Sequence, residues 1–454
     1  MSKDGTKLSI KEKIGYGLGD TASHFVWDMV GFWILIFYTD TFGISAAAAG
    51  TIMLVARFWD MVSDPIMGII ADKTKTRWGK FRPYILWMAL PYSILAVLTF
   101  TTPDLGQTGK IIWAGITYFS LMTVFTAINL PYSSLGAVMT SDSYERAGLN
   151  SYRFIFAFIG QLIVSGTALT LAKYFGNGDN AKGYQITLVL FSVISFILFM
   201  ITFKSTKERI QPLKEQKESI KEDFRNLFKN KPWVILFFVG IISFIMFAIQ
   251  NLSIAYYFKY YIGKEENVQL FNVVGTIALI VAIPFSKALA KRFSKKNVFI
   301  ASSLISGFFF ILLFLPTEKN IVSIYIINIL AKMAYAPAVP LLWTMLADTA
   351  DYSEWKTGRR STGLVFSAAT FAQKAGWGIG GALAGWLLYL FKFVPNVAQS
   401  VTSVLGIKLM ISIIPGILYM TCAIFLFFYT IDKKTCEVMQ EELDRRRIEE
   451  GKSN

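Results

Sequence analysis

Long apolar runs recur along the whole chain and are separated by short polar stretches. Each run holds roughly 20 residues or more, enough to cross the ~30 Å hydrocarbon core of a bilayer as a helix. We predict twelve such helices, near residues 14–39, 46–71, 82–102, 111–139, 150–174, 183–203, 232–261, 267–290, 297–316, 321–347, 361–391 and 404–430. The chain is therefore expected to be an all-α membrane protein with twelve transmembrane helices.

One long polar segment interrupts this series and leaves six apolar runs on each side. It extends from Lys204 to Lys231 and is rich in charge. We expect an N-terminal six-helix half at residues 1–203, a cytoplasmic central loop at 204–231, a C-terminal six-helix half at 232–431 and a cytoplasmic tail at 432–454. Two six-helix halves related by an axis along the membrane normal are the plan of the major facilitator fold.

Basic residues mark one side of the membrane. They cluster in the loop after the second run of each half, whereas the loops after runs 1, 3 and 7 are poor in them. The two basic clusters are Lys73, Lys75, Arg77, Lys80 and Arg82, and Lys287, Lys291, Arg292, Lys295 and Lys296. Cytoplasmic loops carry this excess of Lys and Arg, so both termini are predicted to be cytoplasmic. The polar, basic start of the chain is expected to be an uncleaved tail.

Composition supports a membrane protein and narrows its partners. Hydrophobic residues make up 54% of the chain and charged residues only 17%, less charge than a soluble protein carries. The net charge of +15 resides in the membrane-flanking loops, so membrane lipid is the expected surrounding and no nucleic-acid partner is expected. The two cysteines, Cys422 and Cys436, are too few for a disulfide framework or a zinc site, and no cofactor is expected.

Charged residues inside the second apolar run are the most informative chemistry in the chain. Asp60 and Asp64 lie four residues apart and share a helix face. Two carboxylates at this spacing repel in a low dielectric unless a cation or a proton joins them. Ser63 and Thr126 offer neutral oxygens for a monovalent cation such as Na⁺. The alternative is an Arg57–Asp60 ion pair that only holds helices together.

Two lysines lie deep in later runs. Lys374 is too far from the basic edge of its run to reach the interface, so it needs a carboxylate, which the second run supplies. Lys332 is equally deep, and the sequence names no partner for it.

Polar residues in other runs suggest a substrate site. In the first run Asp20 and Trp27 share a stripe, and an aromatic ring beside a carboxylate suits a sugar, although Trp27 is equally explained as a packing residue. Asn129 offers a donor and an acceptor to a hydroxylated ligand, and Pro131 is expected to loosen the helix around it. Arg153, near the end of its run, is expected to bind ligand or to gate.

Three segments carry a resemblance to a known family. They are RFWDMVSDPIMGIIADKTKTRWGKFRPYI, PYSSLGAVMTSDSYERAGLNSYR and LADTADYSEWKTGRR followed by Lys374. These segments resemble the glycoside–pentoside–hexuronide:cation symporters, and the resemblance covers essentially the whole chain.

The resemblance implies roles for individual residues. It implies a cation site at Asp60, Asp64 and Thr126, and a sugar site that includes Asp20 and Arg153. It places Trp343 and Lys374, with the adjacent Gln373, at or near both sites. The chain departs from the melibiose permease of that family, which has an acid at the position of Asn129 and an asparagine at that of Ser63. The departures argue against melibiose itself as the substrate and favour a proton over sodium.

The expected function is uptake of a sugar (a glycoside, pentoside or hexuronide) coupled to H⁺ or Na⁺ by alternating access. We expect a monomer that spans the bacterial inner membrane several times. Two alternatives remain: a sodium-coupled lysophospholipid carrier, and a membrane sugar sensor that does not transport. An enzyme is not expected, because neither a phosphate-binding loop nor a hydrolytic nucleophile motif is found.

Overall fold

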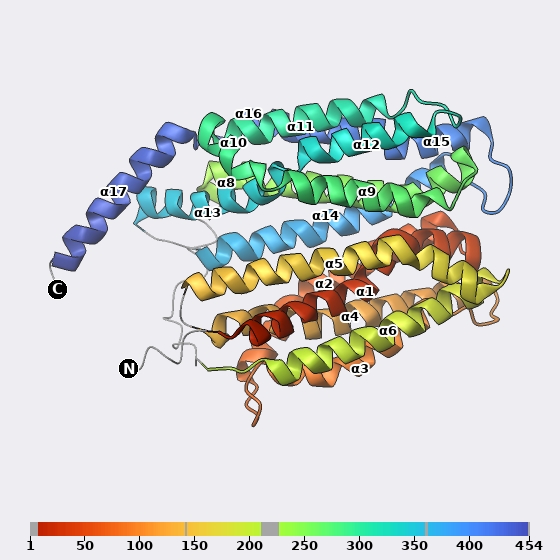
Figure 1. Ribbon diagram of the computed structural model, residues 1–454, viewed down its shortest axis with the longest axis horizontal. Helices are drawn as coiled ribbons and strands as arrows, with labels where there is room; N and C mark the ends of the chain where they lie inside the picture. The colour runs from red at the N-terminus through yellow and green to blue at the C-terminus, as the bar shows by residue number, and fades with distance from the viewer. Residues whose placement is uncertain (1–7, 141–142, 210–226, 359–361, 453–454) are drawn as a thin grey trace.

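The computed structural model describes residues 8–140, 143–209, 227–358 and 362–452 and is built of helices (Figure 1). Most of the expected central loop, residues 210–226, lies outside the described residues. The helices are α1 (Ile10–Ile36), η2 (Phe37–Phe42), α2 (Ala46–Lys73), α3 (Arg82–Thr99), α4 (Gln107–Met139), α5 (Ser143–Gly176), α6 (Asn180–Ser205), α8 (Lys231–Tyr256), η3 (Tyr257–Ile262), α9 (Asn267–Ala282), α10 (Phe285–Phe293), α11 (Lys295–Leu312), α12 (Ile321–Tyr335), α13 (Ala338–Thr357), α14 (Thr362–Leu390), α15 (Val401–Ile411), α16 (Ile413–Phe427) and α17 (Lys433–Lys452).

Twelve membrane-crossing segments follow from these helices, as the hydrophobic pattern predicts. Within the described residues, eight segments are long and apolar enough to cross a bilayer on their own, and α9 with α10 makes a ninth across a 51° bend. The other three are α2, α3 and α14. Charge at the candidate site, including Arg57, Asp60 and Asp64, lowers the hydropathy of α2 without shortening it.

Prolines explain two of the breaks in the predicted runs, but a proline does not break every run that contains one. The run expected at 404–430 also divides, at Ser412 between α15 and α16. Pro284 precedes α10 and Pro337 precedes α13, so the runs expected at 267–290 and 321–347 each become two helices. A proline lacks the N–H that would continue the ladder. Pro131, by contrast, lies inside an α4 that continues to Met139, so the expected loosening does not end that helix.

The helices pack into two bundles that lie side by side (Figure 1). In the N-terminal bundle, α1 packs on α5 and α6, α3 packs on α4 and α6, and α2 packs on α4. In the C-terminal bundle, α11 packs on α12 and α16, α8 packs on α14 and α16, and α9 packs on α12. The bundles meet where α2 packs on α14, α1 on α8, and α5 on α9. We call the end of the molecule that carries both chain termini the terminal end, and the opposite end the distal end.

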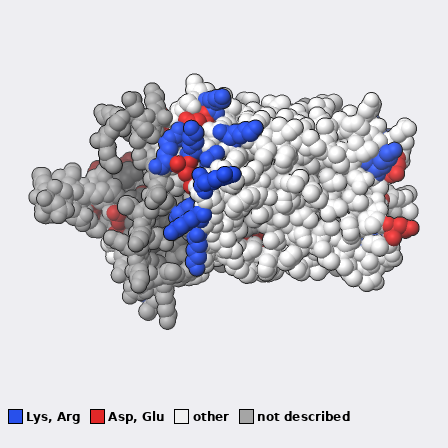
Figure 2. All heavy atoms as spheres, turned by 90° about the horizontal axis from the view of Figure 1, so that it is seen from below, with Lys and Arg blue, Asp and Glu red and all other residues white. Residues whose placement is uncertain are grey.

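The outer surface suits a bilayer. Large apolar side chains such as Ile66, Phe154 and Leu390 are exposed around the bundles. Figure 2 shows a belt almost free of Asp, Glu, Lys and Arg between two charged ends, with Lys and Arg gathered toward the terminal end on the face it displays. This excess at one end agrees with the loop pattern in the sequence.

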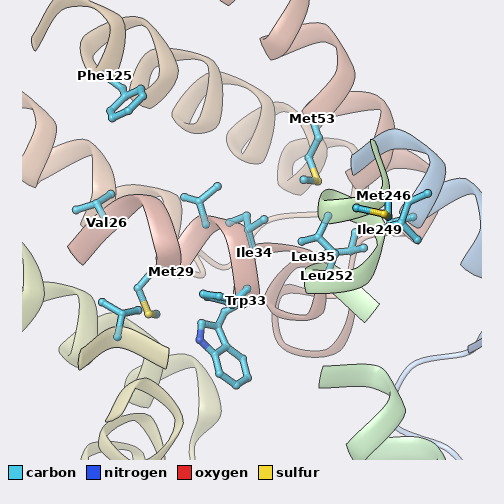
Figure 3. Close-up of a cluster of buried hydrophobic side chains, with 14 of the residues drawn as sticks. Val26, Met29, Trp33, Ile34, Leu35, Met53, Phe125, Met246, Ile249 and Leu252 are labelled. Carbon is cyan, nitrogen blue, oxygen red and sulfur yellow. The ribbon is translucent and has the colours of Figure 1, made fainter. Parts of the chain in front are cut away.

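Apolar side chains fill the contact between the bundles near the distal end. Figure 3 shows Leu35 of α1, Met53 of α2, and Met246, Ile249 and Leu252 of α8 in one cluster. These side chains are almost completely buried. The cluster closes the space between the bundles beyond the charged residues described next.

Candidate functional site

The two carboxylates of α2 meet a hydroxyl of α4. Thr126 Oγ1 lies 3.3 Å from Asp60 Oδ1 and 3.2 Å from Asp64 Oδ1. A hydroxyl has one proton, so it donates to only one of these oxygens at a time and keeps lone pairs for a cation. The structure therefore brings together three of the four oxygens expected from the sequence.

The fourth residue of that set, Ser63, is directed differently. It is buried, but its hydroxyl donates 3.2 Å to the backbone carbonyl of Asp60, one turn earlier on α2. The Ser63 hydroxyl proton is therefore engaged by its own helix.

Two bases hold the carboxylates. Lys374 Nζ of α14 lies 2.6 Å from Asp64 Oδ1, which confirms that the deep lysine finds a carboxylate on α2. Arg57 Nη1 lies 3.0 Å from Asp60 Oδ2, three residues on along the same helix. The packing ion pair expected as an alternative is thus present beside the proposed cation ligands. Two acids and two bases sum to zero formal charge.

The two bases are held with unequal firmness. The Arg57 side chain is 5% exposed and that of Lys374 is 16% exposed. A Cβ added to Gly378 of α14 would lie 2.5 Å from Arg57 Cβ, so this glycine lets α14 pack directly on the arginine stem. Arg57 is therefore confined between two helices, while Lys374 borders open space.

A second ion pair lies nearer the terminal end. Arg153 of α5 binds Asp20 of α1 through two nitrogens, with Nε 2.7 Å from Oδ2 and Nη2 3.2 Å from Oδ1. Arg153 Nη2 also lies 3.4 Å from Ser133 Oγ, and its guanidinium carbon is 4.9 Å from the ring centre of Tyr132. Two parallel N–H bonds fix both side chains in one plane.

One stripe of α4 connects the two ion-pair groups. Thr126, Asn129 and Ser133 recur at spacings of three and four, so they lie on one face over about 10 Å of helix. Asn129 is half-buried. Along the stripe it lies between Thr126, which contacts the Asp60–Asp64 pair, and Ser133, which contacts Arg153. Asn129, which the sequence predicts to bind sugar, thus lies between the predicted cation site and the Asp20–Arg153 pair.

Trp27 is held by neighbours on both faces. Its indole stacks on Phe125 with ring centres 4.5 Å apart, and the guanidinium carbon of Arg57 lies 4.4 Å from its centre. Two groups this close cannot share one face, so both faces are covered in this conformation, as the packing alternative for Trp27 requires. Trp377 of α14 meets its edge at 6.5 Å, a neighbour that the sequence did not single out.

Trp343 and Gln373 lie on helices of the C-terminal bundle. Trp343 of α13 lines an apolar cavity together with Phe244 of α8 and Ala369 and Ala372 of α14. Gln373 is half-buried next to Lys374 on α14. Neither side chain is placed against the carboxylate pair by a described contact.

Sequence reasoning missed a set of contacts that joins the bundles at the distal end. Lys259 Nζ of η3 lies 2.5 Å from Asp40 Oδ2 of η2, and the hydroxyl of Tyr260 donates to the same oxygen. Asn396 Nδ2 donates to the Asp40 carbonyl at 2.5 Å, and the hydroxyls of Thr39 and Tyr256 are 2.7 Å apart. Asp40 and Lys259 lie at the ends of apolar runs, where a charged residue usually indicates only contact with water, so nothing in the sequence indicated this pairing.

Ion pairs described at the terminal end stay within one bundle. Lys13 pairs with Glu145 at 2.8 Å in the N-terminal bundle, and Lys295 pairs with Asp348 at 2.6 Å in the C-terminal bundle. Apart from the Asp64–Lys374 pair at the candidate site, the described ionic contacts between the bundles therefore lie at the distal end.

The site chemistry suits a light monovalent cation or a proton. Throughout residues 8–140, 143–209, 227–358 and 362–452, no group of three or more His, Cys, Asp or Glu side chains is arranged to hold a metal ion. Two carboxylates and a hydroxyl are hard oxygen ligands, which do not favour transition metals.

Comparisons with known proteins agree with this architecture. A family profile described as MFS/sugar transport protein matches residues 15–433. A putative glycoside/cation symporter of Escherichia coli (strain K12) is 37% identical over 99% of this chain and 98% of its own. The isoprimeverose transporter of Lactiplantibacillus pentosus is 35% identical over 93% of this chain and 89% of its own.

Solved structures show the same fold. The crystal structure of a D-xylose-proton symporter superposes with a TM-score of 0.68 at 14% identity, over 94% of this chain and 98% of that one. The match to the family profile and to relatives above 30% identity, both over most of the chain, decides the assignment. This chain belongs to the glycoside–pentoside–hexuronide:cation symporters of the major facilitator superfamily, which are transporters and not enzymes.

Proposed function

We propose that this protein couples uptake of a sugar to H⁺ or Na⁺ across the bacterial inner membrane, with Asp60, Asp64 and Thr126 binding the coupling cation. The observation that carries the proposal is the Thr126 hydroxyl between two carboxylate oxygens, 3.3 Å and 3.2 Å away, at membrane depth. Ionisable groups at this depth are costly and are kept where they face a partner or a water-filled path.

The unequal hold on the two bases suggests how cation and sugar binding are coupled. The unloaded network is already neutral, so an added cation leaves an excess positive charge unless one base moves away. Lys374 borders open space and Arg57 is confined. Cation binding therefore releases Lys374 from Asp64, and the freed ammonium becomes available to the sugar.

The second ion pair supplies the sugar site. Asp20 and Arg153, with Asn129 on the connecting stripe of α4, present the donors and acceptors that sugar hydroxyls need. In this conformation Trp27 is covered, so sugar contact at Trp27 requires either Arg57 or Phe125 to move. Trp343, Gln373 and the freed Lys374 complete the proposed set from the C-terminal bundle.

Alternating access follows from the contacts at the distal end. With the terminal end in the cytoplasm, as the basic loops indicate, the Asp40–Lys259 contact closes the outer side and the structure is inward-facing. Breaking this contact while closing the terminal end would expose the same site outside. The relatives described above are sugar carriers by name, so we favour a sugar over a lysophospholipid.

The driving force is sufficient. One charge that moves through 100 mV gains about 2.3 kcal/mol, which supports roughly a fiftyfold gradient of a neutral sugar.

The test is uptake of a panel of glycosides, pentosides and uronides into proteoliposomes under separate sodium and proton gradients. The intact protein should accumulate its sugar under one of these gradients. Asp64→Cys should abolish accumulation while keeping some sugar binding, and Asp104→Asn, which alters an exposed loop carboxylate, should leave uptake unchanged. Normal uphill uptake by Asp64→Cys would refute the cation site.

A further inference from the structure

Lys332 is a membrane-depth lysine for which the described residues supply no carboxylate. It lies on α12, eleven residues from the distal start of that helix, so about 16 Å inside it. Its ammonium lies 3.0 Å from Gln250 Oε1 of α8, 5.1 Å from the ring centre of Phe247 and 5.8 Å from that of Phe310. Every described neighbour of this charge is therefore neutral.

The lysine points away from the bilayer. The lipid-facing side of α12 is marked by the exposed residues Val322, Ile326 and Met333, and Lys332 lies about 120° around the helix from Ile326. A Cβ added to Gly275 of α9 would lie 3.5 Å from Lys332 Cγ and 2.9 Å from Asn328 Nδ2. Lys332 thus extends over α9 toward α8, inside the C-terminal bundle.

Buried amides on α8, α9 and α12 have unused hydrogen-bonding capacity, and two of them lie at Lys332: Gln250 by its hydrogen bond and Asn328 one turn earlier on α12. Gln250, Asn272 and Asn328 are each more than nine-tenths buried. Gln250 Nε2, Asn272 Nδ2 and Asn328 Oδ1 have no hydrogen-bond partner within the part of the chain that the structure describes. A buried amide without a partner has lost its hydrogen bonds to water and gained none in return, so unpaired amide atoms beside an uncompensated charge indicate a ligand site.

The unused groups specify the ligand. The ammonium has three protons and gives one to Gln250, and two further unpaired atoms are amide donors. Donors therefore outnumber acceptors, and the charge is positive. A carboxylate or a sulfonate, which accepts several hydrogen bonds and carries one negative charge, matches this set.

The site adjoins the surface along which the bundles meet. Phe247, whose ring lies beside the Lys332 ammonium, is 6.3 Å from Trp377 of α14, and Trp377 meets Trp27 of the N-terminal bundle at 6.5 Å. Phe247 and Gln250 are one turn apart on α8, so a rotation of the phenylalanine ring would connect the amide and the lysine to the space between the bundles.

We propose that Lys332, with Gln250, binds the acid group of a carboxylated or sulfonated sugar. The inference rests on the proposed function and narrows its substrate to sugar acids. Asp20–Arg153 is balanced in charge, and so is the cation network before the cation binds. Lys332 has no described carboxylate in this conformation, so its charge is available to match the substrate's negative charge.

A matched pair of substrates tests the proposal. 4-Nitrophenyl β-glucuronide and 4-nitrophenyl β-glucoside differ only in a carboxylate in place of a hydroxymethyl group. Their exchange is measured in proteoliposomes without an ion gradient, so that a defect in coupling does not affect the result. The intact protein should prefer the glucuronide, and Lys332→Met should reduce that preference at least tenfold while leaving glucoside exchange unchanged.

Control variants separate loss of this charge from loss of any lysine. Lys408 of α15 also lies over aromatic rings, 4.7 Å from the centre of Tyr261 and 4.6 Å from that of Phe314. Lys408→Met should keep the glucuronide preference, and Lys332→Arg should retain most of it. If Lys332→Met does not reach the membrane, Gln250→Leu replaces it and should reduce the preference.

Several results would overturn the proposal. They are equal exchange of both sugars by the intact protein, an unchanged preference in Lys332→Met, and an equal loss of both sugars in that variant. Sulfate and phosphate are tested as competitors, to detect a site for free anions. Binding of these ions without binding of the glucuronide also overturns the proposal. If the intact protein shows gradient-driven uptake but Lys332→Met leaves the preference unchanged, only the acid subsite is contradicted. If the intact protein shows no gradient-driven uptake but Lys332→Met alters the preference, only the coupling proposal is contradicted.

Discussion

Replacing Thr126 with valine is the most direct probe of the cation site. Valine keeps the shape of the side chain and removes the hydroxyl that lies 3.3 Å and 3.2 Å from the two carboxylates. A hydrogen bond to a charged group contributes about 1.5–3 kcal/mol, and each 1.4 kcal/mol is tenfold in an equilibrium constant. The cation concentration for half-maximal uptake should therefore change by about 10- to 100-fold.

The direction of the change identifies the ion. If the ion is Na⁺, Thr126→Val removes a ligand oxygen, and the half-maximal sodium concentration should rise. If the ion is H⁺, the variant removes a donor that stabilises the ionised carboxylate, and the half-maximal proton concentration should fall. The measurement is initial sugar uptake into proteoliposomes at a series of sodium and proton concentrations.

A control on the same helix makes the result specific. Thr123 of α4 donates to the Phe119 carbonyl at 2.9 Å and accepts from Trp59 Nε1 at 2.8 Å. Thr123→Val should leave the cation dependence unchanged, and Thr126→Ser, which keeps the hydroxyl, should remain close to the parent protein. An unchanged dependence on both ions in Thr126→Val would refute the bridging role.

Three further predictions address other parts of the molecule. Arg153→Lys loses the two-nitrogen grip on Asp20, so sugar affinity measured by equilibrium binding should fall about tenfold while the cation dependence stays unchanged; an equal change in both would argue for a purely structural role. Asp40→Asn removes the charge that pairs with Lys259 at the distal end, so the outward-open fraction should rise at least about tenfold, measured by labelling of an introduced cysteine between the bundles. Exchanging Asp40 and Lys259 should largely restore the parent fraction, and unchanged labelling of Asp40→Asn would exclude a gating role. Cys436 lies on α17, which packs on α13, and burial raises the pKa of its thiol to about 11. Maleimide labelling at neutral pH should therefore be roughly a hundredfold slower than for a free cysteine and should increase up to high pH; rapid labelling at neutral pH would show that α17 does not stay packed on α13.

The hydrophobic pattern determined the twelve crossings because hydrocarbon imposes one length on every helix that spans it. It also determined that charge at this depth has a purpose, since an ionised group in the membrane needs a partner or water. The pairing of Lys374 with an α2 carboxylate follows from this rule alone. The breaks at Pro284 and Pro337 could not be predicted from the prolines alone, because α4 continues past Pro131 and a proline inside an apolar run therefore does not always end a helix.

The tertiary structure decided which charges pair and which do not. Sequence spacing describes one helix, whereas Asp64 meets Lys374 across 310 residues, Asp20 meets Arg153 across 133, and Asp40 meets Lys259 across 219. The tertiary structure also covered both faces of the Trp27 indole, whereas its spacing from Asp20 in the sequence was compatible with contact to a sugar. Lys332 is the clearest case: the sequence showed a deep lysine, and only the packing of α8, α9 and α12 surrounded it with neutral amides in place of an acid, because the neighbours of a side chain are set by helices distant in sequence.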